Sequence, residues 1–261
     1  MAWHERSRIT AWAVALLLAG CASSGDGPPS DVLNVADAAI AGGDPDMALS
    51  ISQAVLNQQP ENVDALYHEA AAYYALGRCE DAMAAYRVAL TLAPHSATAE
   101  TGVGRCLLKR NAIEAEQAFA AAVADDPDNA VALNDLGVAR DLQGHFAAAT
   151  APYEQSLLVA PGMKATEVNL GLSLALAGQA AEAMDYLGPL AGGTEATARI
   201  RADYAVALVG AGRLDDARQV LSTDLPPDKV QADIDAFTTL LGHGPGDAAQ
   251  AMNLFGYIPP G

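Results

Sequence analysis

The chain has 261 residues and a net charge of −18 at pH 7, with 14 Lys and Arg against 32 Asp and Glu. This acidity excludes nucleic-acid binding by charge, because neutralising phosphates needs a basic surface. Three cysteines are too few for a disulfide framework in a chain of this length. A hydrophobic content of 51% excludes disorder through the body of the chain. Because only 5% of the residues are aromatic, the apolar content is mostly aliphatic, which favours helices.

The first predicted element is a leader peptide over residues 1–20. Arg6 and Arg8 precede an apolar run over residues 10–20, which is the charge pattern of a secretory signal. The run is about half the ~20 residues that a membrane-spanning helix needs. We therefore expect cleavage of the leader rather than a permanent membrane span.

The end of the leader resembles the lipobox of bacterial lipoproteins. Leu, Ala and Gly at 18–20 precede Cys21, and in such proteins the cysteine is lipidated and becomes the mature N-terminus. An ordinary secretory signal with an incidental cysteine is the alternative. Acyl chains on Cys21 would hold the protein firmly on a membrane, and Ala22 after the cysteine implies the outer membrane by analogy with enterobacterial lipoproteins. Residues 21–30 are expected to form a flexible tether.

A period of 34 residues runs from residue 31 to about residue 225. One column of small residues recurs at spacings of 34, 34, 33, 34 and 34: Ala36, Ala70, Gly104, Gly137, Gly171 and Ala205. A second column recurs at spacings of 34, 33, 34, 34 and 34: Ala48, Ala82, Ala115, Ala149, Ala183 and Ala217. A third column holds glycines and skips the third unit: Gly43, Gly77, Gly144, Gly178 and Gly212. Three columns in register predict six copies of one structural unit.

Each unit is expected to be a pair of antiparallel helices, A and B. Small residues let neighbouring helices approach closely, glycine ends helix A in a left-handed conformation, and in the first four units a proline follows helix B. The residue missing from the third unit falls in the turn near residues 109–111. The pattern resembles the tetratricopeptide repeat through the following residues: Leu133, Leu136, Gly137, Gly144, Ala149, Tyr153 and Pro161.

We therefore predict an all-α fold, a right-handed α-solenoid of about six tetratricopeptide helix-turn-helix repeats. A further helix over residues 228–241 is expected to cap the last repeat, so that the solenoid spans residues 31–241. The fifth repeat is expected to end irregularly, because Gly188 and Pro189 replace the usual exit. Residues 242–261 form a Gly- and Pro-containing tail.

The sequence has no pattern typical of catalysis or metal binding. His68, His95, His145 and His243 each lack a His or Cys three or four residues away, the spacing that metal sites on helices use. Neither a G-x-S-x-G nucleophile turn nor a phosphate-binding glycine loop occurs. We expect no catalytic residue, no metal and no cofactor, and we do not expect an enzyme.

Cys79 and Cys106 are expected at the same end of two packed helices. Cys79 falls in the first turn of helix B of repeat two, and Cys106 falls late in helix A of repeat three. A disulfide would need an oxidising compartment and Cα atoms within about 7 Å. The sequence leaves a disulfide and two buried thiols as alternatives.

The predicted binding surface is the concave face, which the A helices line. Exposed positions are expected at Tyr67, Ala71, Tyr74, Thr101, Arg105, Lys109, Asn134, Val138, Asp141, Val168, Leu172, Arg199, Ala202 and Val206. The predicted peptide-binding groove consists of Tyr67, Tyr74, Arg105, Lys109, Asn134, Val138 and Leu172. The tyrosines and Leu172 would anchor a peptide segment of a partner protein, and Arg105, Lys109 and Asn134 would orient it. The alternative is that these residues are only solvated helix faces.

Three segments resemble the TadD-like tetratricopeptide-repeat lipoproteins of the tight adherence (Flp) pilus system. They are residues 133–144 (LNDLGVARDLQG), 168–178 (VNLGLSLALAG) and 186–191 (YLGPLA). The resemblance implies a non-enzymatic pilus assembly factor, anchored by lipid to the outer membrane and facing the periplasm. Its partner would be a segment of the secretin or of another assembly protein. A generic periplasmic lipoprotein adaptor that recruits cell-wall hydrolases or outer-membrane assembly factors is the alternative.

Overall fold

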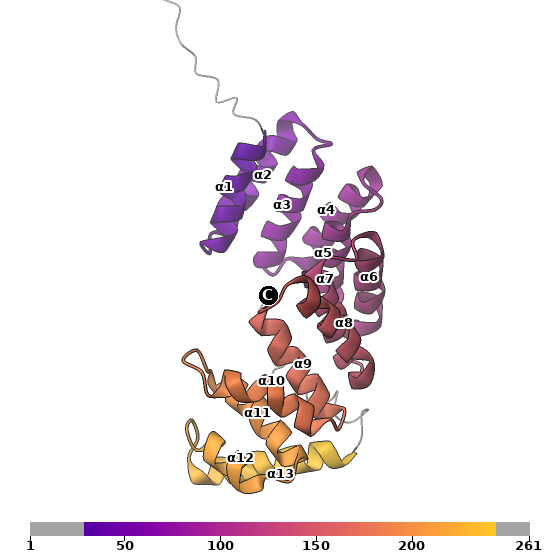
Figure 1. The fold of residues 1–261 in the computed structure, drawn as a ribbon. Coiled ribbons are helices and arrows are strands. Elements are labelled where there is room, and N and C mark those ends of the chain that lie inside the picture. Colours follow the sequence, from indigo (N-terminus) through magenta and orange to yellow (C-terminus); the bar gives the residue numbers. More distant parts are fainter. Residues whose placement is uncertain (1–28, 244–261) are drawn as a thin grey trace, which may run out of the picture.

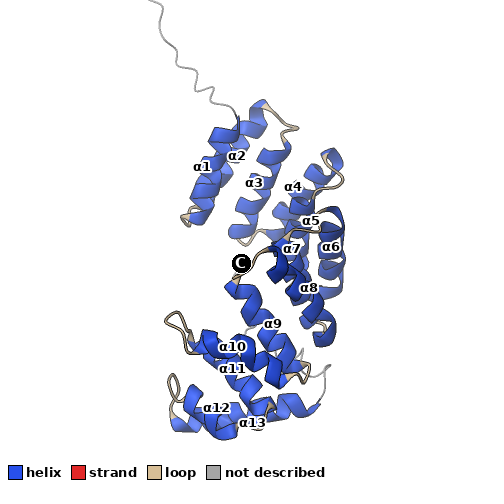
Figure 2. Cartoon of the chain, in the orientation of Figure 1, coloured by secondary structure: helices blue, strands red, loops and turns tan. Residues whose placement is uncertain are grey.

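The computed structural model describes residues 29–243, which form thirteen α-helices and no strand (Figure 2). The expected leader, the lipidation site at Cys21 and all but the start of the expected tail lie outside the described residues. The helices are α1 Pro29–Ala41, α2 Pro45–Gln58, α3 Val63–Ala75, α4 Cys79–Leu92, α5 Ala97–Leu107, α6 Ala112–Asp125, α7 Ala130–Asp141, α8 Phe146–Val159, α9 Lys164–Leu176, α10 Ala180–Ala191, α11 Ala198–Gly210, α12 Leu214–Leu221 and α13 Pro227–His243.

The first twelve helices pair into six hairpins that stack in chain order. Each helix packs on the next, and α13 covers the last hairpin by packing on α11 and α12. Figure 1 shows the hairpins following a curved path, with α4, α6 and α8 on its outer side. The predicted all-α solenoid of six repeats with a terminal capping helix is confirmed. The cap is slightly longer than predicted, beginning at Pro227 and ending at His243.

Side-chain caps explain where several A helices begin. Asn62, Ser96, Asn129 and Thr197 each accept a hydrogen bond from the backbone N–H three residues on, at the starts of α3, α5, α7 and α11. Each cap satisfies a backbone donor that the first turn of a helix leaves unpaired. Asn111 does the same for α6, at the shortened turn of repeat three that has no glycine.

The columns of small residues mark the helix contacts. All six alanines of the second column and the three alanines of the first are fully buried. At Gly137, a Cβ would lie 2.5 Å from the ring of Tyr153 on the partner helix α8, so no side chain fits between the two helices. The five glycines of the third column have φ between 72 and 83°, a conformation that glycine adopts without strain.

The buried core extends along the stack rather than gathering at one centre. One cluster runs from Leu108 in repeat three to Leu240 in the cap, and smaller clusters fill repeats one and two. Each hairpin therefore buries its apolar face only against its neighbours. Within the described range, none of the helices combines the length and the apolar character needed to cross a membrane.

Candidate functional site

Four of the predicted groove residues lie at the surface of α3 and near the C-terminal end of α5, with Lys109 in the turn that follows α5. Tyr67 and Tyr74 are half-buried, and Arg105 and Lys109 are exposed. The hydroxyls of Tyr67 and Ser96 share a hydrogen bond of 2.5 Å, which joins α3 to the start of α5. Burial raises the pKa of Tyr74, and the nearby guanidinium of Arg105 opposes this rise. The two neighbouring A helices thus bring two phenol rings and two cations to one face.

Arg105 is fixed in place by a line of hydrogen bonds across three helices. Its Nε donates to Oδ2 of Asp135 on α7 at 2.6 Å. The other oxygen of Asp135 accepts from Asn134 Nδ2 at 3.1 Å. Asn134 Oδ1 in turn accepts from Thr166 Oγ1 at 3.1 Å and from Asn169 Nδ2 at 3.0 Å, both on α9. These contacts were not predicted from the sequence, because each hydrogen bond between two of the helices joins residues 30 or more positions apart.

Asn134, Val138 and Leu172 are buried, so the prediction that they line an open groove is wrong. Their exposures are 9%, 1% and 6%. The side-chain oxygen of Asn134 accepts the hydrogen bonds that join α7 to α9. Helix α9 packs directly on α11, and this packing closes the inner face of the later repeats. Val138 and Leu172 belong to the main core cluster. Four other positions expected at the surface are also buried: Thr101, Asp141, Val168 and Val206.

Asp141 joins three helices from a fully buried position. Its two oxygens accept hydrogen bonds from Tyr153 Oη on α8 and from Ser173 Oγ on α9, both at 2.7 Å. Burial raises the pKa of Asp141 to about 7, although the two hydrogen bonds act in the opposite direction. The sequence analysis missed this role of Asp141. Tyr153 could have pointed to it, because the hydroxyl of a buried tyrosine needs a hydrogen-bond partner.

Most basic side chains of the A helices are neutralised by acids on neighbouring elements. Arg105 pairs with Asp135, and Arg140 Nε lies 2.9 Å from Glu116 Oε1 on α6. Among the described residues, Lys109 has no ion pair. The side chain of Arg105 also keeps 40% exposure. On the surface of α3 and α5, Lys109 and the partly exposed Arg105 therefore supply the positive charge available to a partner.

Cys79 and Cys106 are both thiols in the structure. Cys79 is the first residue of α4, and Cys106 is the last but one of α5. Cys79 packs against the apolar cluster that contains Cys106. Burial raises the pKa of Cys106, and a hydrogen bond with Cys79 raises it further. The two side chains are neighbours and are not bridged in the structure.

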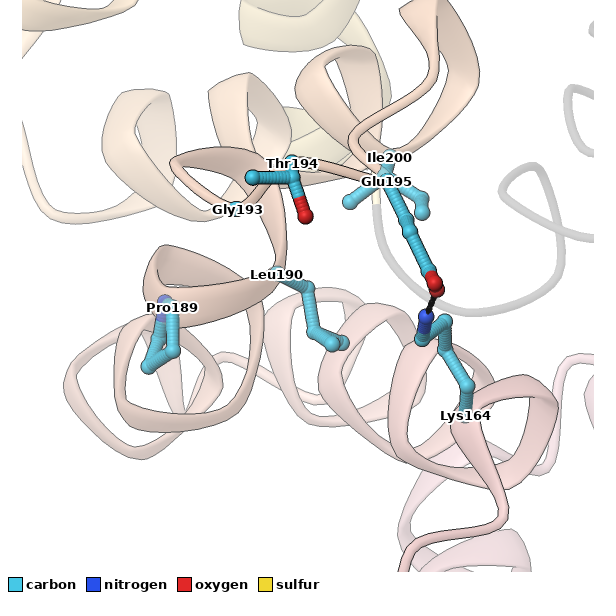
Figure 3. A pocket seen from close by; sticks show the side chains of 7 residues that line it. All are labelled: Lys164, Pro189, Leu190, Gly193, Thr194, Glu195 and Ile200. Carbon is cyan, nitrogen blue, oxygen red and sulfur yellow. Dashed lines mark hydrogen bonds and ion pairs between the residues drawn. The ribbon is translucent and has the colours of Figure 1, made fainter.

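A small pocket lies at the irregular exit of repeat five (Figure 3). Its volume is about 160 Å³, and it is lined by Lys164, Pro189, Leu190, Gly193, Thr194, Glu195 and Ile200. The loop after α10 meets the start of α9 there, and Lys164 and Glu195 form an ion pair across the opening. Small-molecule sites usually measure about 300–1,000 Å³, so this pocket is too small for a typical cofactor. No group of three or more His, Cys, Asp or Glu among residues 29–243 could hold a metal ion.

Comparisons with known proteins agree with this architecture. Residues 33–97 match the tetratricopeptide repeat family. The Protein CTR9 homolog of Arabidopsis thaliana is 34% identical over 119 residues, which are 45% of this chain and 11% of that protein. The chain therefore spans only about a ninth of this curated relative.

Two solved structures are similar over most of the chain. The structure of PilW, described as a widely conserved type IV pilus biogenesis factor, gives a TM-score of 0.66 at 24% identity, covering 74% of this chain and 90% of PilW. The structure of PilF from Pseudomonas aeruginosa gives a TM-score of 0.65 at 18% identity, covering 78% of this chain and 97% of PilF. At these identities the similarity establishes the fold.

The described residues thus have the tetratricopeptide-repeat fold. Domains of this class bind protein or peptide partners, and the family that matches is one of scaffolds rather than catalysts.

Proposed function

We propose that the chain is an outer-membrane lipoprotein scaffold that assists assembly or localisation of the tight adherence (Flp) pilus machinery. The observation that carries the proposal is the stack of six hairpins, whose fold is similar to those of the pilus biogenesis factor PilW and of PilF over about three quarters of the chain. The lipobox-like residues before Cys21 and the resemblance of residues 133–144 to the TadD-like family support it from the sequence.

The binding surface in this proposal is the face formed by Tyr67, Tyr74, Arg105 and Lys109, which we term the α3–α5 face. The phenol rings offer flat, partly apolar contact area to a peptide. Arg105 uses its Nε on Asp135, which leaves its terminal N–H groups for a carbonyl or carboxylate of the partner.

The scaffold would hold its partner by non-covalent binding and would not catalyse a reaction. Because Asp135 already fixes Arg105, the guanidinium loses little further freedom when it binds a partner. Lys109 adds attraction for an acidic or C-terminal group on the partner. A secretin or assembly-protein segment bound in this way would be kept at the membrane by the lipid on Cys21.

Affinity purification of the full-length chain from detergent-solubilised envelopes tests the proposal. Enrichment of the secretin or of other pilus assembly proteins is the expected result. Recovery of cell-wall hydrolases or outer-membrane assembly factors in their place would contradict it and favour the adaptor role.

A further inference from the structure

Two cysteines from different repeats meet at one helix contact. Cys79 opens α4 and Cys106 closes α5, and these helices pack on each other, so the two residues lie at the same end of the contact. Cys79 packs against the cluster that contains Cys106. No other cysteine lies within residues 29–243. The two cysteines of residues 29–243 therefore lie together at the contact between α4 and α5.

The two thiols differ in their access to solvent. Cys106 is 3% exposed, whereas Cys79 is only partly buried. The more exposed Cys79 is therefore the thiol that an external oxidant can reach first.

The acids of the same turn are neutralised by arginines. Asp81 pairs with Arg78, and Glu80 pairs with Arg110. These ion pairs reduce the negative charge that an anionic disulfide such as oxidised glutathione would meet beside Cys79. Cys79 is therefore suited to react first with an external disulfide, and the buried Cys106 is suited to react second.

We propose that Cys79 and Cys106 form a disulfide that links repeat two to repeat three. The oxidant is an external disulfide, either that of a thiol oxidoreductase or a small-molecule disulfide. The Cys79 thiolate attacks one sulfur of the oxidant, which releases the first thiol and leaves a mixed disulfide on Cys79. Cys106 then loses its proton and attacks Cys79 Sγ, which releases the second thiol. The protein gives up two protons and two electrons, and the oxidant is reduced to two thiols.

The disulfide would fix the surface that carries the binding face. Arg105 is adjacent to Cys106 on α5, and Tyr74 on α3 belongs to the hairpin that Cys79 continues. A covalent bond between α4 and α5 holds these two hairpins at one relative position. Only this consequence rests on the function proposed above, since the disulfide itself depends on the two sulfurs.

Peptide mapping of the oxidised full chain tests the bond directly. The reduced protein is incubated with oxidised glutathione under native conditions, remaining thiols are alkylated, and trypsin is added without reductant. Cleavage after Arg78, Arg87, Arg105 and Lys109 isolates each cysteine in a short peptide, residues 79–87 (CEDAMAAYR) and 106–109 (CLLK). The expected product is the linked pair, lighter by the two thiol hydrogens than its separate peptides.

Single variants test the order of attack. Cys106→Ser is expected to retain glutathione on Cys79, while Cys79→Ser is expected to leave Cys106 unmodified in the folded protein. The urea midpoint of the wild type is expected to fall on reduction, and that of Cys106→Ser to stay unchanged. Two alkylated thiols in the oxidised wild type, or glutathione that remains on its Cys79, would overturn the proposal.

The same mapping on protein recovered from cells separates this proposal from the proposed location. A linked pair in both the purified and the cellular protein supports both. If glutathione links the pair but the cellular protein carries two thiols, the disulfide stands and the oxidising periplasmic location is contradicted.

Discussion

Replacing Gly137 by alanine tests whether the small-residue columns exist for close helix packing. The added Cβ would lie 2.5, 2.6 and 2.8 Å from three ring atoms of Tyr153. Tyr153 is fully buried, and its hydroxyl is held by Asp141 at 2.7 Å, so the ring cannot move away without losing that bond. The ring of Tyr86, which stands in repeat two where Tyr153 stands in repeat four, lies against Gly102 of α5.

The expected change in the free energy of unfolding combines one stabilising contribution with two destabilising ones. Alanine gains about 1 kcal/mol over glycine in helix propensity. Overpacking costs about 1–3 kcal/mol, and losing a buried hydrogen bond to a carboxylate costs about 1.5–3 kcal/mol. We expect Gly137→Ala to lower the free energy of unfolding by about 3 kcal/mol.

Urea unfolding followed by far-UV circular dichroism measures this loss. Gly242→Ala is the matched control, because a Cβ there meets nothing within 4 Å, and we expect it to be neutral or slightly stabilising. If Gly137→Ala were as stable as the control, close approach would not be the reason for the small residues.

Three further predictions concern pH, charge and the lipid anchor. Because the folded pKa of Asp141 is raised from 3.8 to about 7, its contribution is largest below about pH 4 and is lost as the pH rises to 7, by up to about 4 kcal/mol at 1.36 kcal/mol per unit. Unfolding free energies across this range should therefore fall more steeply with pH for the wild type than for Asp141→Asn; parallel curves would refute this. Reversing Arg105 and Lys109 together to Glu should weaken partner retention in the envelope purification at least tenfold, whereas reversing the exposed Arg87 and Lys229, which carries the same charge change, should not. Cys21→Ser should move the chain from the membrane to the soluble fraction on cell fractionation, and unchanged membrane retention would rule out the lipid anchor.

The fold could be predicted from the sequence because, in a repeat protein, the residues at the helix contacts recur at a fixed spacing. Each column of small residues fell at a helix crossing, and the glycine column fell at the turns with positive φ. The one-residue deficit near residues 109–111 also indicated the position of the turn in repeat three. This turn has no glycine, and Asn111 caps the helix that follows it. These features are local or recur at fixed spacing, which is why one sequence sufficed to find them.

The candidate site was only half predictable. Periodicity identifies the residues on the inner face, but how closely the A helices approach depends on side-chain volume between repeats. Apolar residues at the inner positions of later repeats, such as Val138 and Leu172, let those helices close on each other. Arg105, at the corresponding position of repeat three, stays at the surface. The change from a charged side chain in repeat three to aliphatic side chains in repeats four and five was the signal that the groove is short.

Site-specific photo-crosslinking in cells that assemble the pilus tests the central claim most directly. A photoreactive residue in place of Tyr74 reports on the α3–α5 face, and one in place of Val88, which is 47% exposed on the outer helix α4, is the control. We predict adducts with the secretin or another pilus assembly protein from position 74 and none from position 88. Adducts with those proteins from position 88 alone, or with cell-wall hydrolases from position 74, would contradict the account.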